Sequence, residues 1–317
     1  MIIGIPRGLY YYKYFPLWKT FFEETGSELA VSPETCRRIL DRGLSSCVGE
    51  ACLPVKAWFG HAQELCGRAD ALFAPRYTSV YPKEYICPKF GGLPDMARHS
   101  LKGLPRLISP EVNRHDRRDG GLRAAVEAGR ALGITEARAK RAYARAVEVY
   151  LKHRNDEITV LPQKAHTPGR REQAATGPVI LLLGHPYTLG DRFLNMDTAR
   201  KLRALGADIL TLANFDSRAL RAAASTLEKP LFWNYGTELL GCANLLMDGP
   251  VVDGVLNLTC FGCGVDSFVG YLFERSVRSR GIPFATVSLD EHTGEAGLMT
   301  RLEAFVDTLR CGKAGVC

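Results

Sequence analysis

The sequence predicts an α/β protein in which parallel sheets are covered by helices. Two stretches of the chain alternate short apolar segments with amphipathic ones, and this alternation is typical of parallel sheets. The chain has 317 residues, of which 46% are apolar and 24% are charged, which is ordinary for globular proteins. A chain of this length is expected to form about two domains.

The first stretch opens with a buried strand and continues as strands and helices in turn. Ser32, Pro33 and Glu34 form a start signal for the second helix. Strands are expected at residues 1–6, Leu29–Val31 and Ala71–Pro75, and helices at Leu17–Glu24, Glu34–Leu40 and Lys56–Leu65.

The second stretch opens with Val179–Gly184, a strand that is expected to be buried on both faces because it is apolar throughout. A helix at Thr198–Leu205 follows and ends at Gly206. Further strands are expected at Asp208–Leu212, Val255–Thr259 and Phe284–Val287, and a further helix at Val265–Arg275.

The two stretches are separated by a long helical region and a linker. Leu122–Lys152 is rich in Ala, Arg and Glu and reads as helical, whereas Pro162–Pro178 is rich in Pro, Gly and charge and has no periodicity. We therefore expect an N-terminal α/β domain with a helical extension at 1–155, a linker at 156–177 and a C-terminal α/β domain at 178–317.

Bulk properties exclude several classes of protein. No apolar run approaches the roughly 18 residues of a spanning helix, and residues 1–16 lack a signal-peptide pattern. The net charge is +7, and many basic residues cluster between Arg114 and Arg154 without an accompanying aromatic motif, which favours a solvated helix face. We expect a cytoplasmic protein that binds neither a membrane nor a nucleic acid.

Ten cysteines are the most informative feature, because structural disulfides are rare in a reducing cytosol. The clearest pattern is an apolar strand that leads to Cys260-Phe-Gly-Cys263-Gly and then to a helix. Backbone N–H groups and the helix dipole stabilise thiolates at such a position, and the carboxyl end of a strand is where open α/β sheets bind ligands. Both thiols are candidates for metal binding or redox chemistry.

Other cysteines divide into two groups by their context. Cys47 and Cys52 precede the helix near Lys56, and Cys87 precedes Pro88, so these thiols lie in turns and caps that can face a cleft. Cys36, at a helix start, is a weaker candidate. We expect Cys66 to be a small buried hydrophobic residue and the C-terminal tail with Cys311 and Cys317 to be frayed, whereas Cys242 is ambiguous.

Three partners suit these thiolates. Zinc needs four ligands, usually in close pairs, and one pair here is close. A thioredoxin-like dithiol would use Cys260 and Cys263 and leave Cys52 and Cys87 unexplained. An iron–sulfur cluster accepts ligands that are far apart in sequence, provided that the fold brings them together. A cluster between the two domains accounts for most of the cysteines.

Motifs in both halves resemble a known superfamily. These motifs are Ile3-Gly-Ile-Pro-Arg7, Glu50-Ala-Cys52-Leu-Pro-Val-Lys56, Glu84-Tyr-Ile-Cys87-Pro-Lys-Phe90-Gly-Gly-Leu-Pro-Asp95, Gly184-His-Pro-Tyr187, Phe261-Gly-Cys263-Gly with Asp266-Ser267, and Asp290-Glu-His-Thr-Gly294 with Arg301-Leu-Glu-Ala-Phe305. Through them the chain resembles the activase-related branch of the 2-hydroxyacyl-CoA dehydratase and benzoyl-CoA reductase superfamily along nearly its whole length, most weakly between Arg114 and Gly177.

The resemblance implies two Rossmann-like, doubly wound domains with a [4Fe-4S] or double-cubane cluster between them. It implies Cys52, Cys87 and Cys263 as ligands, and electrons from an ATP-hydrolysing activase that carries its own [4Fe-4S] cluster. The reaction would be an anaerobic reduction or radical dehydration of a small or CoA-linked substrate. We also expect a homodimer or a heterodimer with a related subunit. No P-loop is visible, so ATP hydrolysis should belong to the separate activase.

The chain also departs from the pattern of that superfamily. Cys260 stands where a small residue is expected, and Cys36 and Cys47 are additional, so six thiols could hold more iron than one cubane. His185 is a candidate proton donor, with a backbone-capping turn residue as the alternative. Glu50 and Asp266 flank the cysteines, and helix capping explains them equally well. The rival functions are a non-catalytic cluster carrier or assembly protein, a dithiol oxidoreductase and a zinc-stabilised interaction module.

Overall fold

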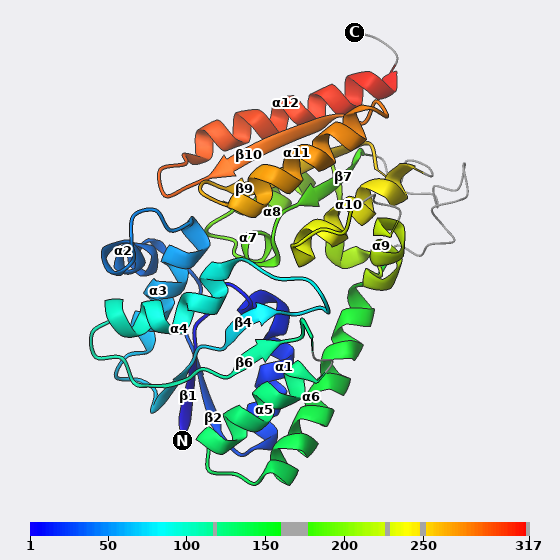
Figure 1. Cartoon of the computed structure of the whole chain (residues 1–317). Coiled ribbons are helices and arrows are strands. Elements are labelled where there is room, and N and C mark those ends of the chain that lie inside the picture. Colours follow the sequence, from blue (N-terminus) through cyan, green and yellow to red (C-terminus); the bar gives the residue numbers. More distant parts are fainter. Residues whose placement is uncertain (117–118, 160–176, 226–228, 248–251, 315–317) are drawn as a thin grey trace. The chain divides into compact units, whose positions relative to one another are not determined.

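The computed structural model describes residues 1–116, 119–159, 177–225, 229–247 and 252–314, and it confirms the α/β class with parallel sheets flanked by helices (Figure 1). The chain divides into two compact units. Unit 1 comprises Met1–Asn155 with Phe232–Asn234, and unit 2 comprises Asp156–Leu231 with Tyr235–Cys317. Most of the linker expected at 156–177 lies outside the described residues. Among those residues, no helix is both long and apolar enough to cross a membrane.

Unit 1 is built on a four-stranded parallel sheet with the strand order β2-β1-β3-β5. A second, two-stranded parallel sheet pairs β4 with β6. The strands are β1 (Ile2–Ile5), β2 (Glu28–Val31), β3 (Ala71–Phe73), β4 (Arg76–Ser79), β5 (Arg106–Ile108) and β6 (Glu111–Asn113). The helices are α1 (Tyr11–Glu24), α2 (Arg37–Ser46), α3 (Leu53–Leu65), α4 (Pro88–Ser100), α5 (Gly120–Ala131) and α6 (Glu136–Glu157).

Helices α1 and α3 cover opposite faces of the first sheet because side chains alternate along each strand. Trp18 and Phe22 of α1 pack against the ring of Phe73, at centroid separations of 4.7 and 4.9 Å. The next residue, Leu72, faces the other side, where Leu65 of α3 also lies close to β1. These apolar contacts on both faces form the core of unit 1.

Several helices of unit 1 differ from the sequence prediction, and α1 begins at Tyr11, six residues before the expected start at Leu17. The helix expected at Leu122–Lys152 is two helices, because Gly133 adopts a φ of +74° after α5 and the hydroxyl of Thr135 accepts a hydrogen bond in the first turn of α6. The helix expected from Glu34 begins at Arg37, since the Ser32 hydroxyl is engaged elsewhere. Helix α4, which Pro88 opens, was not expected.

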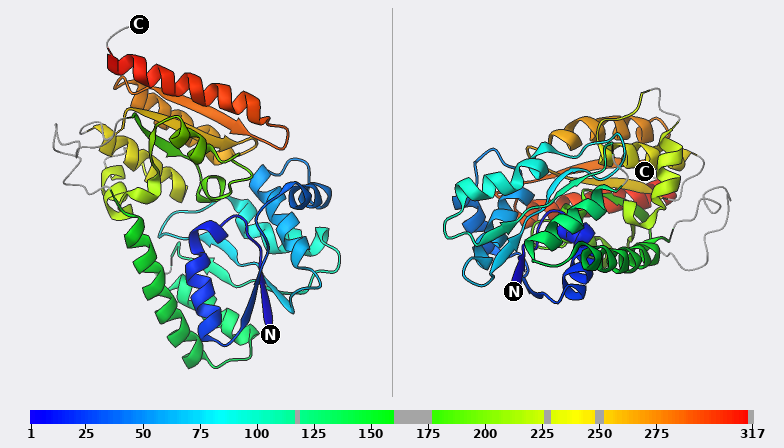
Figure 2. Two further views of the ribbon diagram at one scale, coloured as in Figure 1. Left: turned by 180° about the vertical axis from the view of Figure 1, so that it is seen from behind. Right: turned by 60° about the horizontal axis from the view of Figure 1, so that its bottom comes forward.

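Unit 2 contains a four-stranded parallel sheet with the order β10-β9-β7-β8. Helices α11 and α12 cover opposite faces of this sheet (Figure 2). Gly270 of α11 lies near Asn257, whereas Leu309 of α12 lies against Gly254. Asn257 and Gly254 are three residues apart on the same strand, so they face opposite sides of the sheet. The strands are β7 (Val179–Leu183), β8 (Asp208–Leu210), β9 (Gly254–Cys260) and β10 (Phe284–Leu289). The helices are α7 (Pro186–Gly190), α8 (Thr198–Ala204), the 3-10 helix η2 (Leu212–Asn214), α9 (Ser217–Ala224), α10 (Asn234–Met247), α11 (Gly264–Arg278) and α12 (Glu295–Ala314).

Helices α2 and α3 pack backbone against backbone through two glycines. A Cβ added at Gly43 would overlap the carbonyl oxygen of Lys56, and one added at Gly60 would overlap the carbonyl oxygen of Ile39. The absence of side chains at these two positions allows the close approach. This contact sets the positions of the cysteines that flank both helices.

We expect Gly43→Ala to lower the free energy of unfolding by about 2 kcal/mol or more, because overpacking at a rigid backbone contact outweighs the better helix propensity of alanine. Gly92→Ala in α4 is the matched control, since among the described residues the nearest atom to its added Cβ is Met96 Sδ, at 3.9 Å. Urea denaturation followed by circular dichroism measures both. Equal stability of the two variants would contradict the close contact.

A buried histidine fastens α3 to the loop before α2. His61 is fully buried, its Nδ1 lies 3.0 Å from the Ser32 hydroxyl, and its Nε2 lies 2.9 Å from the Thr35 hydroxyl. Ser32 also accepts a hydrogen bond from the backbone N–H of Arg7. Burial and, to a smaller extent, the charge of Arg7 lower the pKa of His61 to about 4, so the ring is neutral in the folded protein at neutral pH.

The lowered pKa predicts a specific loss of stability in acid. Below the unfolded pKa of 6.5 the unfolded chain binds a proton that folded His61 binds only near pH 4, so stability is full above pH 6.5 and falls toward pH 4. Between pH 7 and pH 5 this amounts to about 2 kcal/mol. Urea denaturation of His61→Gln should show a pH dependence weaker by that amount. His99→Gln, at an exposed position, should behave like the unaltered protein.

Candidate functional site

The candidate site of unit 2 lies at the carboxyl ends of two neighbouring parallel strands. Strand β7 pairs with β9, with Leu183 opposite Asn257. His185 follows β7 as the N-cap of α7, and Cys263 follows β9 as the N-cap of α11. Gly184, between β7 and His185, adopts a φ of +155°, and an added Cβ there would crowd Leu189 and the carbonyl oxygen of Leu258. The turn therefore requires glycine.

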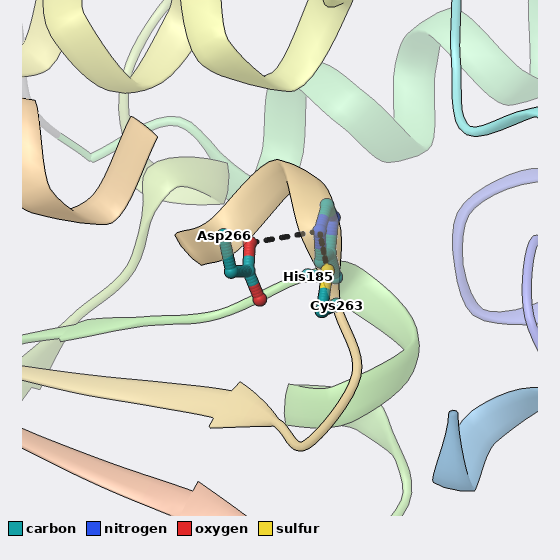
Figure 3. Close-up of side chains that lie close together, drawn as sticks. All are labelled: His185, Cys263 and Asp266. Atoms are coloured by element: carbon teal, nitrogen blue, oxygen red, sulfur yellow. Dashed lines mark hydrogen bonds and ion pairs between the residues drawn. The ribbon is translucent and has the colours of Figure 1, made fainter. Parts of the chain in front are cut away.

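Three side chains from these two turns lie together (Figure 3). The Nε2 atom of His185 lies 3.0 Å from Oδ1 of Asp266 and 3.8 Å from Sγ of Cys263. One ligand atom from each of the three residues lies within 4.8 Å of the other two. The group offers one nitrogen, one sulfur and one oxygen donor, a set that can hold a metal ion.

Asp266 is held in place by several donors although it is buried. Its other carboxylate oxygen accepts a hydrogen bond from the Thr259 hydroxyl at 3.0 Å. Burial alone would raise the pKa of Asp266, but the charge of His185 and hydrogen bonds from His185, Thr259 and Cys263 outweigh burial and lower this pKa. Asp266 is thus an ionised carboxylate that fixes the imidazole ring. The side chain of His185 makes no helix-capping hydrogen bond, so the capping alternative is wrong.

Two tyrosines enclose the imidazole ring. Tyr187 stacks on His185 at 4.9 Å between ring centroids, and the ring of Tyr235 lies 4.0 Å away. Burial, followed by the charges of Asp266 and Cys263, raises the pKa of Tyr235 well above its usual value, so its phenol stays protonated. The hydroxyl of Tyr235 is buried beside the backbone of Gly184, whose hydrogen bond opposes part of this rise in pKa. A polar group therefore lies beside His185.

Cys260 lies apart from this group of three. It ends β9, it is 5% exposed, and its Sγ lies 3.6 Å from the hydroxyl of Thr188. Phe261 and Gly262 separate it from Cys263, and Phe261 is 74% exposed. Neither of these two cysteines forms a disulfide. The two cysteines of this pair thus have different surroundings, one in the sheet and one at a helix start.

In unit 1, three candidate thiols begin helices and a fourth ends one. Cys36 is the N-cap of α2, Cys52 the N-cap of α3 and Cys87 the N-cap of α4, whereas Cys47 is the C-cap of α2. Glu50, in the turn between α2 and α3, is exposed. The positions at helix N-termini favour thiolates, as the sequence suggested.

Burial and charge act in opposite directions on the thiols of unit 1. Burial raises the pKa of Cys52, and the charge of Lys89 and the backbone N–H of Val55 oppose this, whereas the neighbouring Cys87 adds to it. Burial also raises the pKa of Cys47, and the charges of Lys56 and Lys89 oppose it. The mutual influence of Cys52 with Cys47 and with Cys87 indicates that these thiols are neighbours.

The remaining cysteines stand outside both groups. Cys242 is fully buried in α10, and burial raises its pKa to about 12, so it is an inert thiol. Cys66 is half-buried rather than buried, because it lies at the C-terminal end of α3. Cys311 is exposed on α12 and does not belong to a frayed tail, since the helix continues to Ala314. Cys317 lies outside the described residues.

Cys52 and Cys87 belong to unit 1 and Cys263 to unit 2, so the expectation that the three thiols meet stays a prediction. Sequence reasoning missed Thr259 and Tyr235 as neighbours of His185. Tyr235 lies in the first turn of α10, a helix that the sequence pattern did not predict. Only the fold brings the ring of Tyr235 next to the imidazole of His185. The motif Gly184-His-Pro-Tyr187 did contain Tyr187, whose ring stacks on His185.

Comparison with known proteins places the chain in a family. Residues 2–215 match the family described as CoA enzyme activase uncharacterised domain, and this segment includes His185 and all the candidate thiols of unit 1. No curated protein matches the chain. Because the match spans more than half of the 317 residues, the chain belongs to the family of the CoA enzyme activase uncharacterised domain.

Proposed function

We propose that the chain is an iron–sulfur protein that takes low-potential electrons from an ATP-dependent activase for the reduction or radical dehydration of a small or CoA-linked substrate. One observation carries the proposal. Cys52, Cys87 and Cys263, the three thiols implied by the sequence motifs, are each the N-cap residue of a helix. Helix N-termini stabilise thiolates, which are the form that binds iron.

The donor set fits an iron–sulfur cluster. Thiolates are its usual protein ligands, and they need not be close in sequence. When bound, a cluster would supply one-electron transfer at low potential. The chain's own contribution would be burial of the sulfur atoms. Cys260 is 5% exposed, and the other candidate ligands are partly buried, whereas Cys311, which is not a candidate, is exposed. Membership in a family described as related to CoA enzyme activases supports an activase as the electron source.

His185 would act beside the substrate as a hydrogen-bond or proton donor through Nδ1, because its Nε2 is already engaged by the Asp266 carboxylate at 3.0 Å. Thr259 holds Asp266 in turn. The rings of Tyr187 and Tyr235 pack against the imidazole. These contacts orient the ring, with Nε2 also 3.8 Å from the Cys263 sulfur.

The additional thiols bear on the size of the cluster. Cys47 is a neighbour of Cys52, which favours it as a further ligand of a larger, double-cubane type of cluster. Cys36 begins the same helix that Cys47 ends. Cys260 is less suited to this role, because its sulfur is buried at the strand end and lies against the Thr188 hydroxyl.

A second candidate is a single metal ion, such as zinc, held by unit 2 alone. The observation that favours it is the close grouping of His185, Cys263 and Asp266, with donor atoms within 4.8 Å of one another. Nitrogen, sulfur and oxygen donors of this kind are usual zinc ligands, and a site with three protein ligands leaves a position for a substrate.

Metal counting on anaerobically purified variants separates the two candidates. Cys52→Ala or Cys87→Ala should remove most of the iron and sulfide and the broad absorbance near 400 nm, because each removes a cluster ligand. Asp266→Asn should leave the iron and sulfide content unchanged. Cys311→Ala is the matched control and should also change nothing, since this thiol is exposed on α12.

The opposite pattern would favour the single ion. Zinc without sulfide, lost in Asp266→Asn and retained in Cys52→Ala, would overturn the cluster proposal. Protein that binds neither metal and forms a reversible Cys260–Cys263 disulfide would instead support a dithiol oxidoreductase.

Electron delivery is tested by mixing the iron-loaded protein with a CoA enzyme activase, a reductant and ATP under anaerobic conditions. We expect the cluster absorbance to bleach only when all three are present, because a low-potential cluster needs an energised donor. Omission of ATP or its replacement by a non-hydrolysable analogue is the control. Equal bleaching with and without ATP would contradict the activase-dependent function and favour a cluster carrier or assembly protein.

A further inference from the structure

A cavity of about 180 Å³ lies within unit 1, apart from the candidate thiols. It is formed by α1, by β4 and β6, and by the helices α5 and α6. Its walls include Tyr14, Trp18, Tyr77, Arg114, Tyr143 and Val147. None of the lining residues is a cysteine, and no part of the proposed function uses this cavity.

Five of the twelve residues that line the cavity are aromatic, and their neighbours hold the rings in place. Tyr14 stacks on Tyr77 at 5.6 Å between ring centroids and lies 5.7 Å from Tyr150. The Tyr77 hydroxyl accepts a hydrogen bond of 2.8 Å from Nε1 of Trp18. An apolar protein cavity of about 150 Å³ is large enough to bind benzene. This cavity is therefore suited to a flat apolar body of about six or seven carbon atoms.

One end of the cavity is cationic. The Nε atom of Arg114 is buried and has no hydrogen-bond partner among the described residues. Burying such a donor without an acceptor is costly, so the position calls for one. The described lining residues include neither aspartate nor glutamate that could accept this hydrogen bond. An acceptor from outside the chain would satisfy Arg114.

The start of α5 adds to the positive potential at this end. Gly121, in the first turn of this 12-residue helix, lines the cavity, and a Cβ there would overlap the hydroxyl of Tyr143. The first turn of α5 carries no acidic residue, and the N-cap Asp119 makes no side-chain capping bond. The helix N-terminus and Arg114 both favour an anion, and the N-cap Asp119 offsets part of this potential.

From this combination we propose that the cavity binds a small monocarboxylate with a flat apolar body. The carboxylate accepts the hydrogen bond of Arg114 Nε, and the apolar body lies against the aromatic wall that Tyr14 and Tyr77 form together. An inorganic anion satisfies Arg114 but leaves the aromatic walls unfilled, whereas a neutral aromatic molecule leaves the guanidinium without an acceptor.

Isothermal titration calorimetry of the full chain at pH 7 tests the proposal with phenylacetate and its neutral analogue phenylacetamide. We expect saturable binding of phenylacetate and binding of the amide that is weaker by about tenfold or more, because a hydrogen bond to a charged group is the stronger one. Arg114→Met should weaken phenylacetate binding by about the same factor. Arg123→Met, an exposed arginine on α5, is the matched control and should change nothing.

Val147→Phe provides an independent variant, since a larger side chain at this lining position fills the cavity and should abolish binding without removing a charge. Thermal melting shows whether each variant is folded. Failure of phenylacetate to bind at millimolar concentration, equal affinity for the amide, or full binding by folded Val147→Phe would each overturn the proposal. Loss of binding in both variants, with the Arg123 control intact, supports it.

Discussion

The parallel pairing of β7 with β9 is the constraint on which the candidate site of unit 2 depends. The two strands run in the same direction in register, so the turns that follow them emerge at the same edge of the sheet. His185 and Cys263 occupy these turns, and α11 adds Asp266 in its first turn. A register shift of one residue would turn the strand side chains to the other face and separate the two turns. The geometry of the site is thus a property of the sheet.

The candidate site also depends on helix N-termini, which stabilise thiolates, whereas burial of the thiols disfavours the charged form. Cys36, Cys52, Cys87 and Cys263 are all N-cap residues, where backbone N–H groups favour a thiolate. The pKa of Cys52 is nevertheless raised, because burial outweighs the charge of Lys89 and the nearby N–H. A thiol in such a position keeps its proton until a metal replaces it, so metal binding releases protons and strengthens toward higher pH.

The alternation of strands and helices could be predicted from the sequence because buried parallel strands are continuous apolar runs, as in Val179–Leu183. The first residues of the helices were harder to predict from the sequence. Ser32 looks like a cap but binds His61 and Arg7 instead, a tertiary contact that local sequence does not reveal. Helix α4 was not expected, although a proline such as Pro88 at the first helical position is a helix-start signal.

In the candidate site, too, residues marked by a local sequence pattern could be predicted, and residues brought in by tertiary contacts could not. Cys263 and His185 could be found because each follows an apolar strand directly, and strand ends in parallel sheets carry ligand sites. Asp266 was equally well explained as a helix cap. Its hydrogen bond to His185 joins residues that are 81 positions apart in the sequence (266 − 185), so only the fold creates this contact. Tyr235 could not be assigned at all, since an isolated tyrosine in a helix carries no local signal.

The hydrogen bond between His185 and Asp266 also weighs the two metal hypotheses against each other. Nε2 and Oδ1 bond to one another at 3.0 Å, so a single ion that used both atoms would have to replace this contact in a buried site. Binding through Cys263 alone leaves the pair intact, with Asp266 still held by Thr259. An iron–sulfur cluster requires only the thiolate from unit 2. The buried hydrogen bond therefore favours Cys263 as a cluster ligand with His185 beside it over a mononuclear centre.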